Sequence, residues 1–252
     1  MKVTNLAFYQ FVQLDDPDAL AAALGAECAR LGLRGTVTVG PEGINAMLAG
    51  PGDAADAFVQ WLRDDERFES TPLKLSASDH IPFRRLKVKV KPEIVSMRVD
   101  GVRTWERTAP HLAPEALRDL LRGGRDDLAL IDTRNDFEVD LGTFRGALNP
   151  HTTSFSEFPS WVEEHRDELA GKQVVMFCTG GIRCEKATSW MLDAGFEDVL
   201  QLDGGVLNYF AQVDDAERDW EGRLFVFDER ETLDTTGRGG SPREDAPPPC
   251  DE

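Results

Sequence analysis

Apolar and polar positions between residues 113 and 212 alternate in a regular way. Short apolar runs lie at 128–131, 174–177 and 199–202, and amphipathic stretches lie at 114–121, 155–169 and 182–192. Parallel strands read as continuous apolar runs because helices cover both faces of their sheet. The alternation of such runs with helical patterns therefore predicts a parallel α/β sheet in this half of the chain.

The first 95 residues show a different pattern. Strand-like segments lie at 5–14, 35–39, 44–49 and 73–75, and helix-like segments lie at 19–31 and 54–68. The order βαββαβ predicts a ferredoxin-like or acylphosphatase-like α+β sandwich. Cys28 shares an apolar helix face with Leu20, Leu24 and Leu31, so we expect it in the core.

One thiol lies where a parallel sheet gathers its chemistry. Cys178 follows the run 174–177, and a helical pattern begins near Ile182, so the cysteine ends a strand and opens a tight turn. Ligands of open α/β sheets collect at this edge. The loop that follows the thiol is formed by Thr179, Gly180, Gly181 and Ile182. We expect the two glycines to adopt positive φ and the loop amides to form an anion cradle.

Arg183 and the helix N-terminus add positive charge to this loop. We therefore predict that Cys178 ionises more readily than a free thiol, whose pKa is about 8.5. The alternative is an unreactive cysteine packed at a strand end. Four residues separate Cys178 from Arg183. Cysteine phosphatases use a longer C-x5-R loop that surrounds a phosphate, so the spacing favours chemistry on an atom bound to sulfur.

Longer segments carry a resemblance to a known family. CTGGIR followed by CEKA resembles the active loop of a rhodanese domain. Together with IDTRNDFEVDLGTFRGALNP, TVTVGPEGIN and PFRRLKVKVKPEIV, it resembles the rhodanese-related tRNA uridine hydroxylases from about residue 5 to about residue 234. The resemblance implies an enzyme with an acylphosphatase-like domain and a rhodanese domain. It also implies oxygen-dependent formation of 5-hydroxyuridine at the tRNA wobble position.

The resemblance also implies roles for individual residues. It makes Cys178 and Arg183 the catalytic candidates. The matching Asp132 and Arg134 of rhodanese domains brace the fold near the loop. Cys184 is either a resolving thiol for oxidised Cys178 or a small residue that faces the core. Lys186 could contact RNA, but we expect it to face water.

Cofactor motifs are not evident in the sequence. Molecular oxygen is the expected co-substrate, and no flavin or haem motif reveals an electron donor. Four histidines, at 80, 111, 151 and 165, form no ligand spacing, so we predict no metal. Four cysteines do not resemble a disulfide framework in 252 residues. No run of about 18 apolar residues and no signal peptide are present, so we expect a cytoplasmic protein that does not span a membrane.

Charge is distributed unevenly along the chain. Residues 1–95 hold 11 Lys+Arg and 13 Asp+Glu, a net of −2, so the remaining 17 and 33 give −16 beyond them. An acidic protein must bind RNA through local basic patches. The basic segment 82–95 provides one candidate, formed by Arg84, Arg85, Lys87, Lys89 and Lys91. It predicts either a phosphate track or a charged edge strand that resists aggregation, and the resemblance favours RNA.

Five segments are expected: a first domain at 1–95, a connector at 96–112, a rhodanese domain at 113–218, an ordered extension at 219–234 and a disordered tail at 235–252. Cys250 in this tail is expected to have no role. Three functions compete. They are the wobble-uridine hydroxylase, a sulfurtransferase with a Cys178 persulfide, and a non-catalytic adaptor. The sulfurtransferase leaves the first domain unexplained, and the intact loop argues against the adaptor.

Overall fold

The computed structural model describes residues 2–124 and 126–240. The chain divides into two compact units, Met1–Ser96 and Met97–Glu252, and each is described by itself. Residues 97–112 of the predicted connector group with the second unit. Hydrogen bonds explain this, because the Thr108 hydroxyl donates to the Glu185 carboxylate at 2.8 Å and the Gln201 amide donates to the Ala109 carbonyl at 3.0 Å.

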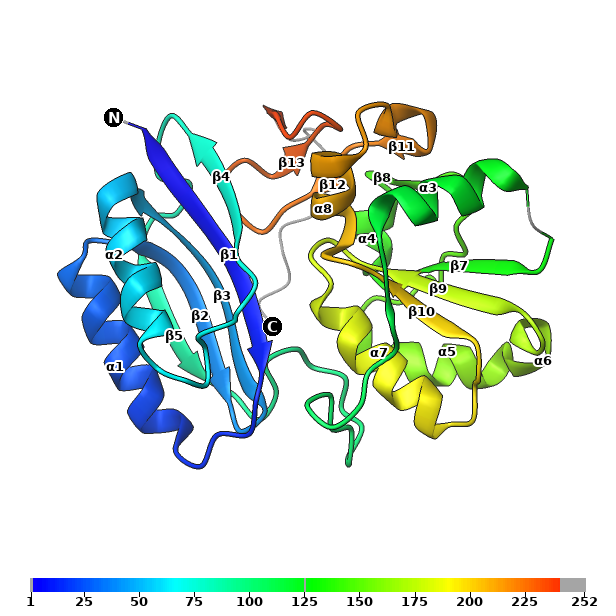
Figure 1. Ribbon diagram of the computed structural model, residues 1–252, viewed down its shortest axis with the longest axis horizontal. Coiled ribbons are helices and arrows are strands. Elements are labelled where there is room, and N and C mark those ends of the chain that lie inside the picture. Colours follow the sequence, from blue (N-terminus) through cyan, green and yellow to red (C-terminus); the bar gives the residue numbers. More distant parts are fainter. Residues whose placement is uncertain (1, 125, 241–252) are drawn as a thin grey trace. The chain divides into compact units, whose positions relative to one another are not determined.

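The first unit is a five-stranded sheet with two helices (Figure 1). Its elements are β1 (Val3–Phe11), α1 (Pro17–Arg30), β2 (Arg34–Gly40), β3 (Gly43–Pro51), α2 (Gly52–Arg63), β4 (Lys74–Ser78) and β5 (Leu86–Val90). The strand order is β4-β1-β3-β2-β5, in which β2 and β5 are parallel and the other pairs are antiparallel. The predicted βαββαβ sandwich is confirmed, with β5 added at one edge.

Both helices of the first unit pack against one face of its sheet. Leu24 of α1 and Phe58 of α2 join Leu6 and Val37 of the sheet in one buried cluster. Cys28 is also fully buried in this cluster, so the prediction that it belongs to the core is confirmed. Helix α1 begins as its sequence predicts, because the Asp16 side chain accepts a hydrogen bond from the Ala19 amide and Pro17 follows the cap.

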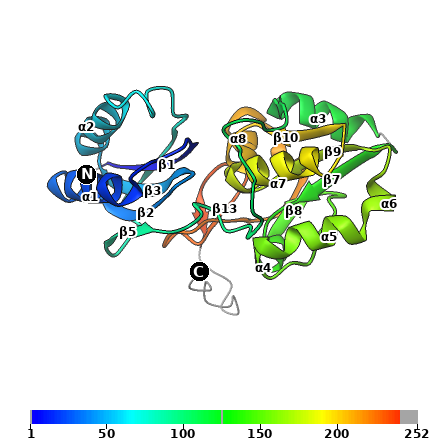
Figure 2. The same cartoon turned by 90° about the horizontal axis from the view of Figure 1, so that it is seen from below.

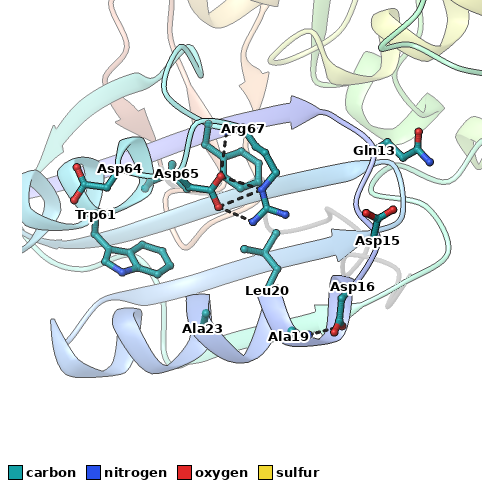
Figure 3. Close-up of a pocket in the computed structure, with 12 residues that line it drawn as sticks. Gln13, Asp15, Asp16, Ala19, Leu20, Ala23, Trp61, Asp64, Asp65 and Arg67 are labelled. Atoms are coloured by element: carbon teal, nitrogen blue, oxygen red, sulfur yellow. Dashed lines mark hydrogen bonds and ion pairs between the residues drawn. The ribbon is translucent and has the colours of Figure 1, made fainter.

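Helix α2 ends at Arg63, five residues before the predicted end. The next residues form tight turns instead, in which the Phe68 amide donates to the Asp65 carbonyl at 2.8 Å. Beside these turns, a groove of about 830 Å³ lies between α1 and α2 (Figure 3). Its lining includes Trp61 and Leu20, together with aspartates such as Asp65, which pairs with Arg67 at 2.6 Å. None of the predicted site residues lines this groove.

The second unit contains a four-stranded parallel sheet in the order β6-β10-β9-β7. Its elements up to residue 212 are β6 (His111–Leu112), α3 (Pro114–Gly123), β7 (Leu128–Asp132), α4 (Asp136–Val139), β8 (Gly142–Phe144), the 3-10 helix η1 (Phe155–Glu157), α5 (Phe158–Glu164), α6 (Arg166–Leu169), β9 (Gln173–Phe177), α7 (Ile182–Asp193), β10 (Val199–Leu202) and α8 (Gly205–Gln212). Helices α3 and α8 cover one face, and α5 and α7 cover the other (Figure 2). The predicted parallel α/β fold is confirmed.

One predicted helix of this unit is interrupted. The sequence predicts a continuous helix over 155–169, but the structure has η1, α5 and α6 in its place. The helical path breaks at His165, whose backbone adopts φ −105° and ψ 15°. Its ring bonds back to the Trp161 carbonyl at 2.8 Å and stacks on the Trp161 ring at 4.5 Å. No helix within residues 2–124 and 126–240 is long and apolar enough to cross a membrane.

The last described segment packs back onto the second unit. After the 3-10 helix η2 (Ala216–Arg218), it forms β11 (Trp220–Gly222), β12 (Leu224–Phe225), β13 (Thr232–Leu233) and β14 (Gly239–Gly240). β11 pairs with β8, and Trp220 and Leu224 enter the buried cluster around Phe144. β14 pairs with β13, so the prediction of disorder from residue 235 is wrong as far as Gly240. Residues 241–252, with Cys250, lie outside the described residues.

Candidate active site

The loop after β9 has the geometry of an anion cradle. Gly181 adopts a left-handed conformation with φ 101°, whereas Gly180 does not have the positive φ that we predicted for it. The Gly181 amide donates a hydrogen bond to Cys178 Sγ at 3.1 Å. The loop carbonyls are bound from outside, because the Val206 amide of α8 donates to the Cys178 carbonyl at 3.0 Å. The Leu207 amide likewise donates to the Thr179 carbonyl at 3.1 Å, so the start of α8 holds the first residues of the loop.

Cys178 is almost fully buried, with 1% of its surface exposed. Burial raises the pKa of this thiol, but other contacts more than compensate. A hydrogen bond from Cys184, the charge of Arg183 and the backbone amides of Arg183 and Gly181 together lower the Cys178 pKa to about 6. The group is therefore largely a thiolate at neutral pH, and the thiolate is the nucleophilic form of cysteine.

Arg183 is held by Glu138, a residue for which we predicted no role. The guanidinium forms two hydrogen bonds with the Glu138 carboxylate, at 2.6 and 2.9 Å. Glu138 is fully buried, yet the charge of Arg183 and its hydrogen bonds keep the Glu138 pKa below its usual value against the effect of burial. The Thr179 hydroxyl lies 3.4 Å from the same carboxylate. Glu138 thus joins the arginine and the first loop residue.

A local signal for Glu138 exists in the sequence. Asn135 is the N-cap of α4, and the Glu138 carboxylate accepts from the Asn135 amide at 3.1 Å, which is one half of a capping box. That N-x-x-E spacing begins four residues after the end of the predicted strand 128–131. The pattern predicts the cap but not the contact with Arg183, which lies 45 residues away.

Asp132 and Arg134 form a second buried ion pair near the end of β7. Both side chains are fully buried, with a contact of 2.6 Å, and the Thr143 hydroxyl also donates to Asp132 at 2.7 Å. Arg134 donates to the Gly142 carbonyl at 2.6 Å, and its guanidinium lies 5.2 Å from the centre of the Trp220 ring. The pair thus links β7 to β8 and to the C-terminal extension. Its bracing role stays a prediction.

Cys184 lies in the first turn of α7 and is fully buried. Its sulfur is 3.6 Å from the Thr133 hydroxyl. Burial and the hydrogen bond to Cys178 raise the Cys184 pKa well above its usual value, so this thiol stays protonated and donates to the Cys178 thiolate. Cys184 therefore faces the core and also contacts the reactive sulfur. Cys28, Cys178 and Cys184 are all free thiols.

Comparison with known proteins agrees with this geometry. Residues 3–94 match the family model of the UPF0176 acylphosphatase like domain, and residues 113–212 match that of the rhodanese-like domain. A tRNA uridine(34) hydroxylase from Xanthomonas euvesicatoria is 49% identical over 92% of this chain and 94% of its own length. The chain belongs to the tRNA uridine(34) hydroxylase family. The resemblance stated from the sequence is thus confirmed.

Further relatives lie at a similar distance. A tRNA uridine(34) hydroxylase from Ralstonia nicotianae is 47% identical over 92% of this chain and 83% of its own length. Among solved structures, the rhodanese-like domain of a protein from Anabaena sp. is 21% identical, with a TM-score of 0.37. It covers 45% of this chain and 79% of that chain.

Helix α7 of this family member holds two charged residues that sequence reasoning misplaced or missed. Lys186 is fully buried, so the prediction that it faces water is wrong. Glu185 is 8% exposed and accepts from the Thr108 hydroxyl at 2.8 Å and from the Gln201 amide at 3.1 Å. His111 lies 3.1 Å from Glu185, which is the main cause that raises the His111 pKa. This polar cluster ties the predicted connector to α7 and β10.

The predicted RNA-binding residues lie in the first unit of the chain, in β5 and beside it. β5 is an edge strand whose ladder with β2 continues at both ends, through the Arg85 carbonyl and the Lys91 amide. The Val88 side chain points towards Gly25 of α1. Strand alternation therefore places Lys87 and Lys89 on the opposite, helix-free face. Arg84, Arg85 and Lys89 are exposed, and Lys87 and Lys91 are half-buried. Both predictions for this segment, a phosphate track and a charged edge, fit this placement.

Proposed function

We propose that this protein hydroxylates the wobble uridine of tRNA, residue 34, to 5-hydroxyuridine with molecular oxygen. The observation that carries the proposal is a buried Cys178 whose sulfur accepts a hydrogen bond from the Gly181 amide and whose pKa is lowered, in a chain that shares 49% identity with a tRNA uridine(34) hydroxylase over 92% of its length. The relatives' names supply the reaction, and the site supplies a nucleophile suited to it.

A thiolate at Cys178 can activate the uracil ring. Addition of the sulfur to C6 forms a C–S bond and leaves C5 electron-rich, so that C5 can react with oxygen. One oxygen atom stays on C5 and the other leaves as water, which requires two electrons and two protons from an external donor such as a pair of thiols that is oxidised to a disulfide. Loss of the C5 proton then expels the Cys178 thiolate and restores the ring double bond.

Arg183 has a supporting part in this scheme. Its charge lowers the Cys178 pKa, so the nucleophile is present at neutral pH. The two hydrogen bonds to Glu138 hold that charge in one place, and a preorganised charge needs no rearrangement during the reaction. We assign Cys178 as the catalytic nucleophile and Arg183 as the group that stabilises its anionic form.

The basic segment of the first unit offers a surface for the RNA backbone. Lys87 and Lys89 lie on the helix-free face of β5, and Arg84 and Arg85 are exposed just before it. In a chain with a net charge of −18, such a local run of cations is a natural phosphate track. We propose that it positions the tRNA, while the loop of the second unit performs the chemistry.

The proposal is tested by nucleoside mass spectrometry of tRNA from aerobic cells that lack this protein and any parallel hydroxylation pathway. We expect 5-hydroxyuridine and its derivatives to be absent, to return with the wild-type chain and to stay absent with Cys178→Ser. Cys28→Ser is the matched control, because Cys28 is a buried free thiol of the other unit. Full hydroxylation by Cys178→Ser would exclude the proposed mechanism.

The second candidate is a sulfurtransferase that carries a persulfide on Cys178. The contact between the Gly181 amide and the sulfur favours it, because the same cradle would stabilise a persulfide anion. The two functions give different results in the same experiment. Loss of 2-thiouridine with unchanged 5-hydroxyuridine would indicate sulfur transfer.

A further inference from the structure

The C-terminal extension carries an aromatic ring beside the reactive loop. Phe227 lies between β12 and β13, and its ring centre is 5.9 Å from the guanidinium carbon of Arg183. This is within the range of a cation–π contact. The same ring is 46% exposed, whereas Cys178 is 1% exposed. The surface beside Arg183 thus includes a large, flat apolar group.

Neighbouring rings hold Phe227 from one side. Phe225 meets it edge-on at 4.9 Å, and Phe137 meets Phe225 edge-on at 5.2 Å. Phe137 precedes Glu138, the carboxylate that anchors Arg183. The three rings therefore form a continuous array that ends at the surface in Phe227.

Backbone hydrogen bonds and an ion pair also hold the turn that carries Phe227. The Val226 amide donates to the Glu231 carbonyl at 2.9 Å, and the Glu231 amide donates to the Asp228 carbonyl at 2.9 Å. The Asp228 side chain is 3% exposed and forms an ion pair with Arg230 at 2.5 Å. A turn closed by these contacts fixes the position of the ring between them, and a fixed aromatic ring loses little entropy when a ligand stacks on it.

Single exposed apolar residues are common and need no function. Two observations distinguish Phe227. It contacts the cation that lowers the Cys178 pKa, and it is stiffened by other rings while nearly half of its surface stays open. Single-stranded RNA loops are recognised largely by stacking their unpaired bases on such rings.

We propose that Phe227 is a stacking subsite for a nucleobase that flanks the target uridine in the tRNA loop. This inference rests on the proposed function. The target uracil must reach a thiol that is 1% exposed, so it has to leave the stack of the loop. The ring lies at the surface next to Arg183, where an adjacent nucleotide of the same strand would follow. The flanking base loses its stacking contact with the extruded uridine, and stacking on Phe227 replaces that contact.

The test uses the full chain and an anticodon stem-loop RNA that contains the target uridine. Stacking on an aromatic side chain contributes to the binding of each base, so Phe227→Ala should raise KM about tenfold. We expect kcat to change little, and Phe227→Trp to restore KM because stacking does not need a particular ring. The pH profile of Cys178 alkylation should match that of the wild type.

A second arm identifies the stacked base. Stem-loop RNAs with an abasic nucleotide on either side of the target uridine are compared on the wild type and on Phe227→Ala. We expect one abasic position to raise the wild-type KM by a similar factor and to have little further effect in the variant. That non-additive result is the signature of a direct contact.

Phe196→Ala is the matched control. Phe196 forms the same kind of pair with Arg166, at 4.8 Å, but it follows the far end of α7, roughly 18 Å along the helix from the loop. An unchanged KM for Phe227→Ala in an active enzyme would overturn the subsite and leave the proposed function intact. A changed alkylation profile with unchanged KM would also overturn it, because the ring would then act only through Arg183. A wild-type chain that forms no 5-hydroxyuridine would reject the proposed function, and the subsite with it.

Discussion

The two basic regions of this protein differ in almost every physical respect. Arg183 is 7% exposed, and a buried carboxylate binds it at two points. The cations of β5 lie on an edge strand, where Lys89 is exposed and Lys87 is half-buried. A buried, anchored charge acts strongly on one neighbouring atom, whereas surface charges act together on a polyanion and are screened by salt. The comparison shows that a basic residue in the sequence becomes informative only when its environment is known.

We expect the largest effect from the loss of a buried, paired arginine. The second buried ion pair, between Arg134 and Asp132, provides this test. Arg134→Met leaves Asp132 buried without its partner, and loss of one member of such a pair costs about 3–5 kcal/mol of unfolding free energy. Urea unfolding followed by tryptophan fluorescence measures it, because four of the five tryptophans lie in residues 97–252.

The matched control for this change is Arg103→Met. Arg103 pairs with Glu106 at 3.2 Å, and both side chains are well exposed. Surface pairs contribute about 0–1 kcal/mol, so we expect a small change there. If Arg134→Met proved as mild as Arg103→Met, the predicted bracing role of Asp132 and Arg134 would be wrong.

The next effect concerns the chemistry of the loop. Cys178 alkylation by iodoacetamide should follow a pKa of about 6 in the wild type. Arg183→Gln removes a nearby positive charge, which should raise this pKa by about 1–3 units. The reactive thiolate would then form only at higher pH. The pH dependence of the alkylation rate measures the shift, with Cys178→Ser as the background.

Arg183→Lys separates the effect of the positive charge from the effect of the guanidinium geometry in this experiment. It keeps the positive charge but loses the two-point contact with Glu138. We expect a Cys178 pKa between those of the wild type and Arg183→Gln. Equal alkylation profiles for all three proteins would mean that Arg183 does not stabilise the thiolate.

The smallest effect is expected at the surface. Replacement of both Lys87 and Lys89 by Gln should weaken tRNA binding several-fold at low salt. It should also reduce the slope of log K against log salt by about 0.7–0.9 for each lost phosphate contact. Lys172→Gln, just before β9 in the other unit, is the control. An unchanged salt slope would leave β5 as a charged edge strand without a role in RNA binding.

Local pattern predicted the fold well. The apolar run 174–177 and the helical pattern from Ile182 became β9 and α7, and the sandwich order of the first unit is correct. Periodicity predicts an element because it reports which face of a strand or helix is buried. Periodicity failed to predict which faces of α7 are buried, because all seven residues from Arg183 to Ser189 are buried. A helix enclosed on every side has no polar stripe to predict, so Lys186 was wrongly assigned to water.

The missing parts of the candidate site depend on distant contacts. Glu138 meets Arg183 across 45 residues, and Phe227 approaches the same arginine from the C-terminal extension. Neither contact leaves a periodic trace in the sequence. The cysteine loop was recognisable because its glycines, thiol and arginine are adjacent in the chain. The groups that hold this loop in place were not, since only the folded chain brings them together.

The start of α8 places a limit on how portable the reactive loop is. A Cβ atom at Gly205 would lie 2.5 Å from the Cys178 carbonyl oxygen and 2.8 Å from both the Thr179 oxygen and the Gly181 nitrogen. The shape of the loop therefore depends on close contact with the backbone at Gly205, which lies outside the loop's own sequence. A designer who grafts residues 178–183 onto another α/β scaffold must also graft a bare backbone opposite them, because any side chain at that point would displace the cradle.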